Sequence, residues 1–298
     1  MSRYAVISDI HGNRHALEAV LRAMARLELD GVICLGDIVG YGPAPGPCID
    51  LVTRYCDVIV QGNHDEAVVD FRRAAMFNGP ARTAIEWTQD HLGPLHLSAL
   101  NQLQPVAYID HNVICVHDNP APGPSDYVYD QFIAATSFGG FDRQICLIGH
   151  THVPVVFEAP PAGETATRET RSGEAGAGKK RAGKEEAGKK TAPADADNTP
   201  SGLDHGPLLQ AVRPDQIRVI APNHEKPIEL AADCRYICNP GSVGQPRDAD
   251  PRASFAILDT DGLTFTMIRC EYDIAAAQRD SQEAGLPGIL AERLAVGA

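Results

Sequence analysis

Five short segments of the sequence place carboxylate, imidazole and amide side chains beside glycines. These segments span residues 9–13, 36–43, 62–65, 116–118 and 149–152. Each one directly follows a short apolar run that is typical of a strand. Glycine permits tight turns and close approach of the backbone. Because polar residues that follow strands of an α/β sheet line a common crevice, we expect these side chains to converge on one site.

The residue types favour a pair of metal ions and cleavage of a phosphate ester. Such cleavage needs a nucleophile at neutral pH, neutralisation of the phosphoryl oxygens and a proton for the leaving group. Two divalent ions about 3.5–4 Å apart can generate the attacking hydroxide and neutralise the charge. A mixed set of His, Asp and Asn ligands disfavours a calcium-type, all-oxygen site. We therefore predict two divalent ions, with manganese preferred and iron, zinc or nickel as alternatives.

The apolar pattern predicts the elements that position these segments. Near the N-terminus, strands at 5–8, 32–35 and 58–60 alternate with a helix whose apolar stripe runs from Leu17 to Leu27. This alternation favours parallel pairing with helices on the sheet faces. Helices are also predicted at 81–91, 95–103, from Ile274 onward and at 289–294, and strands at 113–116, 145–148, 153–157, 217–220, 236–238, 255–258 and 265–269. We predict an α/β fold of the α+β sandwich type, with two sheets packed face to face between flanking helices.

The composition narrows the functional class. The formal net charge of −13 argues against general nucleic-acid binding, because phosphate backbones are held mainly by Lys and Arg. No apolar run is long enough to span a membrane, and the N-terminus lacks a signal peptide, so we expect a cytoplasmic protein. Cys34, Cys115, Cys146 and Cys238 lie in apolar runs, and no Cys-x-x-Cys pair occurs, so buried reduced thiols are expected.

We predict a single domain over 1–298, interrupted by a disordered low-complexity insertion at about 160–206. The insertion contains an imperfect five-residue repeat and lacks aromatic residues, and a period of five matches neither helix nor strand. Its segments 173–180 and 183–190 fit the Gly-x4-Gly-Lys start of a phosphate-binding loop. Both have Lys where Ser or Thr would bind magnesium, and neither follows a strand, so neither is interpreted as a nucleotide site.

In their order, Asp-x-His-Gly, Gly-Asp, Gly-Asn-His-Asp, a lone His and Gly-His-Thr-His resemble the calcineurin-like metallophosphoesterase superfamily. Gly-Tyr-Gly-Pro at 40–43 and the segment 239–248 make the chain similar to its small bacterial and archaeal phosphoesterases. The resemblance implies a four-layer fold, with two mixed sheets between helices, and a specific ligand set. It implies that one ion is held by Asp9, His11 and His152, that the other is held by Asn63, His117 and His150, and that Asp37 bridges both. It also implies that His64 donates a proton to the leaving group and that Asp65 orients His64.

The sequence departs from relatives at positions that would contact substrate. Protein phosphatases of the superfamily have Asp-Arg-Gly where this chain has Tyr41-Gly42-Pro43, so the arginine that grips phosphate is missing there. Tyr41 either packs the loop or faces the substrate. Arg247 either replaces the missing anion contact, or else caps the Asp248 turn or pairs with a carboxylate. An extra carboxylate, Asp118, follows His117 and leaves the substrate preference open.

These features predict a phosphatase or phosphodiesterase acting on small phosphate esters or nucleotides, by in-line attack of a metal-bridging hydroxide. A diadenosine-tetraphosphate hydrolase or a Ser/Thr protein phosphatase is the alternative within the enzyme class. A protein-binding scaffold of the same fold is the non-enzymatic alternative, which the presence of His64 and of every expected ligand disfavours. Exposed sheet edges would also permit a homodimer.

Overall fold

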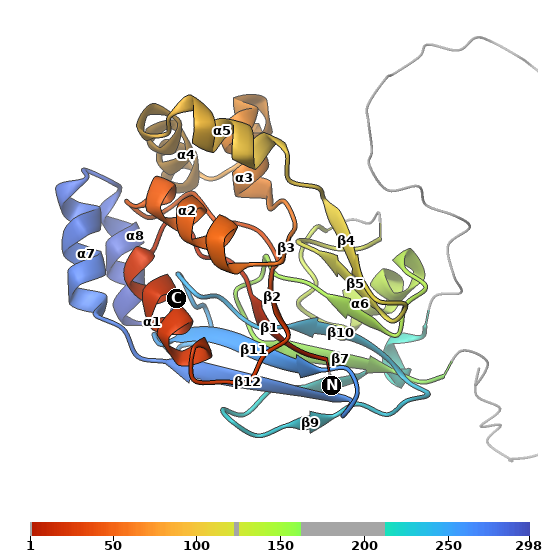
Figure 1. Cartoon of the computed structure of the whole chain (residues 1–298). Helices are drawn as coiled ribbons and strands as arrows, with labels where there is room; N and C mark the ends of the chain where they lie inside the picture. The colour runs from red at the N-terminus through yellow and green to blue at the C-terminus, as the bar shows by residue number, and fades with distance from the viewer. Residues whose placement is uncertain (1, 122–124, 162–211) are drawn as a thin grey trace, which may run out of the picture.

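Two stacked sheets of six strands each form the centre of the structure (Figure 1). The computed structural model describes residues 2–121, 125–161 and 212–298. In spatial order, the first sheet contains β3 (Val58–Ile59), β2 (Gly31–Cys34), β1 (Arg3–Ile7), β11 (Ala253–Asp259), β12 (Thr264–Cys270) and β9 (Ile228–Glu229). The second contains β4 (Val106–Ile109), β5 (Val113–Val116), β6 (Ile145–Leu147), β10 (Arg235–Asn239), β7 (Val155–Ala159) and β8 (Arg218–Ile220).

Both sheets are mixed, as the sequence predicts. In the first sheet, β1, β2 and β3 run parallel to one another, whereas β11 pairs antiparallel with β1. In the second, β5, β6 and β10 are parallel, and β4 and β7 pair antiparallel with their neighbours. Parallel strands end at the same edge of a sheet, so each sheet brings several strand ends to one side of the molecule.

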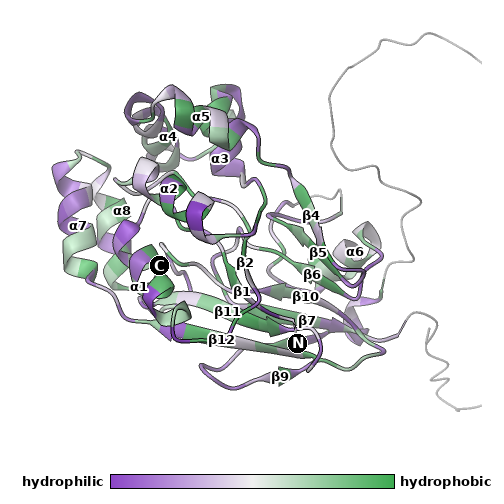
Figure 2. Cartoon of the chain, viewed as in Figure 1, coloured by the Kyte–Doolittle hydropathy of each residue, from purple (hydrophilic) through white to green (hydrophobic). Residues whose placement is uncertain are grey.

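Side chains that alternate along the strands build three apolar layers. On β1, Val6 faces the second sheet, whereas Ala5 and Ile7 face helices on the outer side. Figure 2 shows the hydrophobic colouring concentrated on the strands. The outer face of the first sheet is covered by α1 (Arg14–Met24) and α2 (Pro45–Tyr55), and α3 (Asn63–Val69), α4 (Gly79–His91) and α5 (Pro94–Asn101) extend the same apolar cluster beyond α2 (Figure 1). The second sheet is covered by α6 (Gln131–Ser137). The result is four layers: helices, sheet, sheet and helix.

Two further helices, α7 (Ile274–Glu283) and α8 (Gly288–Glu292), complete the C-terminal part and pack beside α1 (Figure 1). All eight cysteines are free, and Cys34, Cys115, Cys146 and Cys238 are buried, which confirms the prediction of buried thiols. Among the described residues, no helix has the length and apolar character needed to cross a bilayer.

Several elements escape the sequence-based prediction. The start of α2, Pro45-Gly46-Pro47, looks like a turn, but proline fits the first helical turn because its missing N–H would have no partner there. The helix α3 begins at Asn63, inside a segment whose side chains suggest a ligand loop. The helix α6 and the strands β4 and β9 are also unexpected, and β9 has only two residues.

The segment expected to be a disordered insertion lies outside the described residues, apart from positions 160 and 161. The strands on either side of it, β7 and β8, pair antiparallel with Glu158 opposite Arg218. Arg218 Nη2 donates to Glu158 Oε2 at 2.7 Å. The ends of the intervening segment are therefore adjacent, and a short connection can join them.

We expect deletion of residues 160–206 to leave catalysis nearly intact and to change the free energy of unfolding by less than about 1 kcal/mol. The melting temperature should therefore shift by no more than about 2–4 °C. Thermal unfolding of the full-length and shortened chains tests this expectation. A fall of more than about 10 °C would show that the segment supports the sheet.

Candidate metal centre

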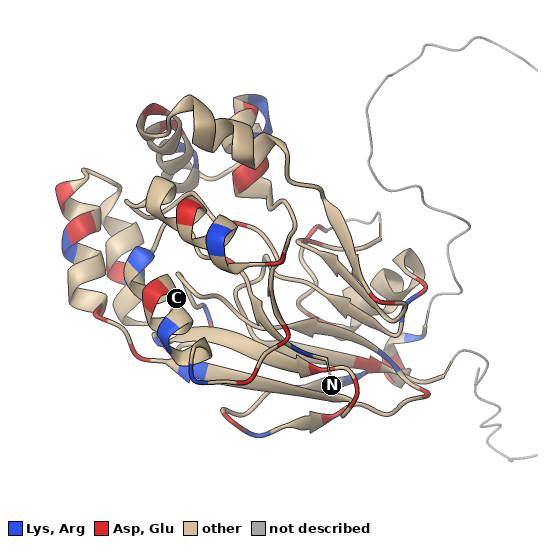
Figure 3. Cartoon of the chain, in the orientation of Figure 1, with Lys and Arg blue, Asp and Glu red and all other residues tan. Residues whose placement is uncertain are grey.

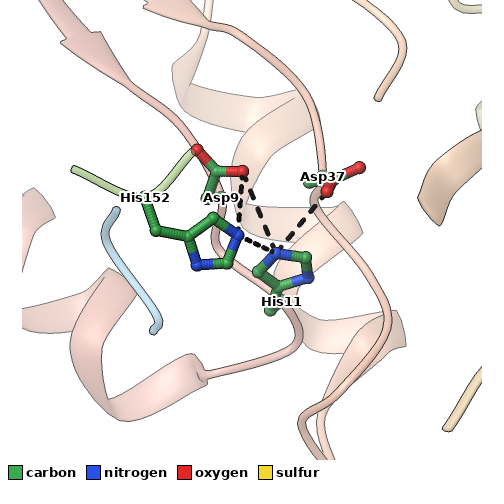
Figure 4. A group of neighbouring side chains, drawn as sticks. All are labelled: Asp9, His11, Asp37 and His152. Atoms are coloured by element: carbon green, nitrogen blue, oxygen red, sulfur yellow. Dashed lines mark hydrogen bonds and ion pairs between the residues drawn. The ribbon is translucent and has the colours of Figure 1, made fainter. Parts of the chain in front are cut away.

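Six buried side chains with metal-ligating atoms converge between the two sheets. The ligand atoms of Asp9, His11, Asp37 and His152 all lie within 4.8 Å of one another, and those of Asp37, His117 and His150 meet the same limit. Figure 4 shows the first group, with the imidazoles of His11 and His152 and the Asp9 carboxylate turned toward one another. Asp37 belongs to both groups, which is the position expected for a bridging carboxylate.

Each ligand follows the end of a strand or lies close to one. Asp9 and Asp37 lie just beyond β1 and β2 of the first sheet. His117 directly follows β5, and His150 lies just beyond β6 in the second sheet. The strands β1 and β2, and likewise β5 and β6, are parallel, so their carboxyl ends meet at one edge. The candidate site therefore contains residues that follow strands of both sheets.

The backbone at this site adopts a conformation that residues with a Cβ rarely use. The φ angles are 55° at Asp9, 50° at His11, 53° at Asp37, 65° at His150 and 61° at His152. Left-handed φ values in non-glycine residues persist where surrounding contacts enforce them, and such residues cluster at functional sites. Here the contacts are backbone hydrogen bonds between the loops, including Asp9 N–H to Gly36 O at 3.0 Å and His11 N–H to Asp37 O at 2.9 Å.

Backbone carbonyl groups fix three of the imidazole rings. The Nδ1 atoms lie 3.0 Å from Val39 O for His11, 2.7 Å from Leu35 O for His117, and 2.7 Å from Gln245 O for His152. A carbonyl oxygen can only accept, so in each ring Nδ1 carries the proton and donates it. In a neutral ring Nε2 then carries the lone pair, the arrangement that suits a histidine bound to a metal through Nε2.

The spacing of the Nε2 atoms fits a bound cation. Nε2 of His11 and Nε2 of His152 lie 3.0 Å apart. With both protons at Nδ1, two lone pairs face each other, which is unfavourable unless a cation lies between them. Two nitrogens bound to one ion at about 2.1 Å and at right angles to each other lie roughly 3 Å apart. Asp9 Oδ1 lies 3.3 Å from His152 Nε2, and Asp37 Oδ2 lies 3.5 Å from His11 Nε2, within the same range.

The second group also presents ligand atoms without partners. His117 Nε2 is buried without a hydrogen bond, although it lies 3.3 Å from Asp37 Oδ2. Asn63 Oδ1 is likewise buried and unpartnered among the described residues. Asn63 is held beside Asp37, because the N–H of the next residue, His64, donates to Asp37 Oδ1 at 2.9 Å. A neutral amide oxygen and imidazole nitrogens fit a divalent ion of the manganese, iron or zinc type.

Burial and neighbouring charges shift the pKa values of Asp9 and His117 at the site. Burial raises the pKa of Asp9 to about 7, with a further contribution from the nearby Asp37 carboxylate. Burial opposes a charge on His117 as well, but Asp37 and Asp9 together raise its pKa to about 10. Without metal, the charge of the Asp9 carboxylate is offset only in part, by His117 and more weakly by Arg247, so its pKa stays raised. Divalent cations would balance the remaining charge and favour the ionised carboxylates.

Comparison with known proteins places these residues in a family. Residues 2–169, more than half of the chain, match the calcineurin-like phosphoesterases. The chain belongs to the calcineurin-like phosphoesterase family.

The chain resembles other proteins over its whole length. It is 30% identical to the uncharacterized protein MJ0912 of Methanocaldococcus jannaschii, over 99% of this chain and 98% of that protein. It is also similar to the crystal structure of a metallophosphoesterase from Sphaerobacter thermophilus, with 35% identity, a TM-score of 0.73 and coverage of 100% and 99% of the two chains. The hypothetical protein PH1004 from Pyrococcus horikoshii shares the fold, with a TM-score of 0.65 at 17% identity and the same coverage.

His64 lies beside the two candidate ligand groups and belongs to neither of them. It is the second residue of α3, and its ring lies between those of Tyr41, His11 and Phe77, with centroid distances of 4.5, 4.8 and 4.7 Å. Its Nδ1 is buried without a hydrogen bond, and burial lowers the pKa of His64 to about 4. Gly40, at φ 82°, lies so close that a Cβ there would overlap His64 Nδ1.

The structure corrects the role expected for Asp65. Its carboxylate does not orient the His64 ring but accepts three backbone N–H groups, from Ile38 at 2.9 Å, Val39 at 3.2 Å and Gly62 at 3.0 Å. Asp65 occupies the third position of α3, where a carboxylate can accept the N–H of the capping residue. Asp65 therefore ties α3 to the loop that carries Asp37. The Gly-Asn-His-Asp pattern hides this role because Asp65 is adjacent to His64 only in sequence.

Tyr41 and Arg247 lie together at the edge of the ligand cluster. The Tyr41 ring lies 4.5 Å from the ring of His11, and the Arg247 guanidinium lies 5.7 Å from the Tyr41 centroid. Arg247 does not pair with Asp248, whose Oδ2 accepts instead from Arg269. Arg247 Nη2 donates to Gln245 Oε1 at 2.9 Å.

Tyr127 is an aromatic neighbour of the metal centre that the sequence does not reveal. Its ring stacks on that of His150, with centroids 3.8 Å apart and planes inclined by 25°. The side chain is 42% exposed, so one face packs on a ligand while the rest meets solvent. No motif marks Tyr127, since it lies outside the five ligand segments and reaches His150 only through the fold.

Proposed function

We propose that this chain is a two-metal phosphoesterase that hydrolyses phosphate esters. The observation that carries the proposal is the convergence of the His11 and His152 Nε2 atoms, with both opposite nitrogens tied to backbone carbonyls. The two Nε2 lone pairs face each other beside two carboxylates and repel one another, and a bound cation would replace this repulsion with attraction. Membership of the calcineurin-like phosphoesterase family supports the same conclusion.

The proposed division of labour follows the geometry. Asp9, His11 and His152 would hold one ion, Asn63, His117 and His150 the other, and Asp37 both. Bound divalent ions would provide a nucleophile at neutral pH and neutralise the phosphoryl charge. His64, which is not a ligand, would donate a proton to the leaving oxygen, and Asp65 would keep α3 in register with the Asp37 loop. Tyr41 and Arg247 are proposed substrate contacts.

The proposed substrates are small phosphate esters or nucleotides. The absence of an arginine at 41–43 argues against a phosphoprotein substrate. A substrate panel tests this assignment, with a monoester, a diester, a dinucleoside polyphosphate and a phosphopeptide assayed in manganese, magnesium, nickel and zinc. We expect turnover of the monoester or the diester with manganese. Dominant turnover of the dinucleoside polyphosphate or the phosphopeptide would favour those alternatives, and inactivity on all four would favour a scaffold.

We also propose that the protein resides in the cytoplasm and that it forms a homodimer.

Removing the metal should destabilise the protein. A ligand present at 100 to 1,000 times its Kd stabilises the folded state by about 2.7–4.1 kcal/mol. We therefore expect treatment with a chelator to lower the melting temperature by several degrees, and manganese to restore it. Differential scanning calorimetry measures both changes, with calcium as the control ion because it prefers all-oxygen sites. An identical melting temperature with and without chelator would argue against a bound metal.

A further inference from the structure

Two arginines from distant parts of the chain meet on a single side chain. Arg247 Nη2 and Arg293 Nη1 both donate to Gln245 Oε1, at 2.9 and 3.3 Å. Arg247 lies in the loop after β10, whereas Arg293 begins the short 3₁₀ helix Arg293–Ala295 near the C-terminus. Because both bonds end on the same oxygen, the two guanidinium groups lie within two hydrogen-bond lengths of each other. Gln245 thus gathers two positive charges at one place.

Neither guanidinium is paired with a carboxylate in the described part of the chain, and Arg247 acts on Asp9 only beyond ion-pair distance. Elsewhere on the described chain, acidic and basic residues are interspersed (Figure 3), and arginines pair locally, as Arg14 does with Glu18 at 2.6 Å and Arg252 with Asp250 at 2.6 Å. Within the described residues, no carboxylate lies within ion-pair distance of Arg247 or Arg293. The Nε atoms of both are buried without a hydrogen-bond partner. Two adjacent guanidinium groups that each have an unpartnered N–H donor favour the binding of an anion.

The arginine pair adjoins the metal centre. The backbone N–H of Arg247 donates to His152 O at 3.2 Å, and Gln245 O accepts from Nδ1 of the same histidine at 2.7 Å. The guanidinium of Arg247 lies 5.7 Å from the ring centroid of Tyr41, which itself packs on His11 and His64. Tyr41 therefore lies between the proposed metal ligands and Arg247, and Arg247 is joined to Arg293 through Gln245.

We propose that Arg247 and Arg293 form an anion subsite that binds a second phosphoryl group of the substrate, next to the phosphoryl group that is cleaved. The proposal rests on the proposed function and narrows its substrate class to nucleotides with two phosphoryl groups, in which the bond that breaks is a phosphate ester (nucleoside bisphosphates) or a phosphoanhydride (nucleoside diphosphates). A guanidinium group matches phosphate oxygens through paired N–H donors, and two such groups can surround one phosphoryl group. Gln245 acts as a positioning residue, because its side-chain oxygen holds the two guanidinium groups next to each other.

The test compares substrates that share one nucleoside. The value of kcat/KM is measured for AMP, ADP and adenosine 3′,5′-bisphosphate with the manganese-loaded full chain. We expect one of the two substrates with a second phosphoryl group to exceed AMP by about tenfold or more. Arg293→Gln should reduce that ratio by roughly 10- to 100-fold, since a hydrogen bond to a charged group is lost. Arg293→Lys, which keeps the positive charge but loses the paired N–H donors of the guanidinium group, should give an intermediate ratio of the kcat/KM values. The matched control is Arg279→Gln, an exposed arginine on α7, which should preserve the ratio.

A binding measurement separates the subsite from catalysis. Calorimetric titration of the same proteins with α,β-methylene-ADP should show about tenfold weaker binding for Arg293→Gln and unchanged binding for Arg279→Gln. Equal binding by the two variants, or a wild-type protein without preference for a second phosphoryl group, would overturn the subsite. A protein that binds the ligand through Arg293 but hydrolyses no phosphate ester would instead refute the proposed function while supporting the subsite.

Discussion

Replacing Asp37 by Asn is expected to remove one of two metal ions and to lower kcat/KM by at least about 10³-fold. The side chains are nearly isosteric, so the folded structure should survive. An amide, however, has only one oxygen to offer, and its NH₂ group donates hydrogen bonds instead of binding a cation. Asp37 belongs to both ligand groups, and no other described carboxylate does. Removing one group that stabilises charge in the transition state typically lowers kcat by about 10²–10³-fold. Asp37→Asn alters a proposed ligand of both ions, so we expect a loss at the upper end of this range or beyond it.

Metal content by emission spectrometry and turnover of a phosphate monoester measure the effect of Asp37→Asn. The control is Asp50→Asn, because Asp50 is 72% exposed and pairs with His96 on the surface, far from any ligand group. We expect the control to retain two ions per chain and full activity. An Asp37→Asn protein that kept both ions and near-normal turnover would disprove the bridging assignment.

Replacing His64 by Ala should separate metal binding from proton donation. His64 contacts neither Asp9 nor His152 by a hydrogen bond, so both ions should remain bound. We expect kcat to fall by about 10²–10⁴-fold for alkyl phosphates, the range typical of a lost general acid. The fall should be much smaller for p-nitrophenyl phosphate, whose leaving group needs no proton.

His96→Ala provides the matched histidine control, because His96 lies on the surface and pairs with Asp50 at 3.1 Å. Leaving-group dependence is the decisive measurement for His64. If His64→Ala slowed alkyl and p-nitrophenyl phosphates equally, His64 would act by shaping the site, for example by packing against Tyr41 and Phe77, and not by giving a proton.

The sequence predicts the centre of the site well because its residues obey a local rule. Asp9, Asp37 and His117 each follow a short apolar run, and in a sheet with parallel strands such positions meet at one edge. Apolar runs also predict the two stacked sheets, because they identify strands even where the ends shift by a residue or two, whereas the mixed pairing follows from the resemblance to the family. The segment 113–116 matches β5 at both ends.

Interactions that depend on backbone atoms or on distant packing could not be predicted. The carbonyls of Leu35, Val39 and Gln245 orient three imidazoles, yet a carbonyl is common to every residue and leaves no mark in the sequence. Asp65 was assigned to His64 by adjacency, whereas its carboxylate caps α3 and the Asp37 loop. The meeting of Arg247 with Arg293 depends on how the C-terminal helices fold back, which no local pattern records.

The position of β1 in its sheet has a consequence for how the protein matures. This strand, which leads to Asp9, lies between β2 and β11, so one of its edges stays unpaired until residues 253–259 have left the ribosome. The carbonyl that orients His152 comes from residue 245. A nascent chain that has just completed its Gly-His-Thr-His segment therefore already carries all seven of the proposed ligands, but not yet the carbonyl that orients His152. We accordingly expect the ions to bind only after almost the entire polypeptide has been made, so that loading of the ions is coupled to the last steps of folding.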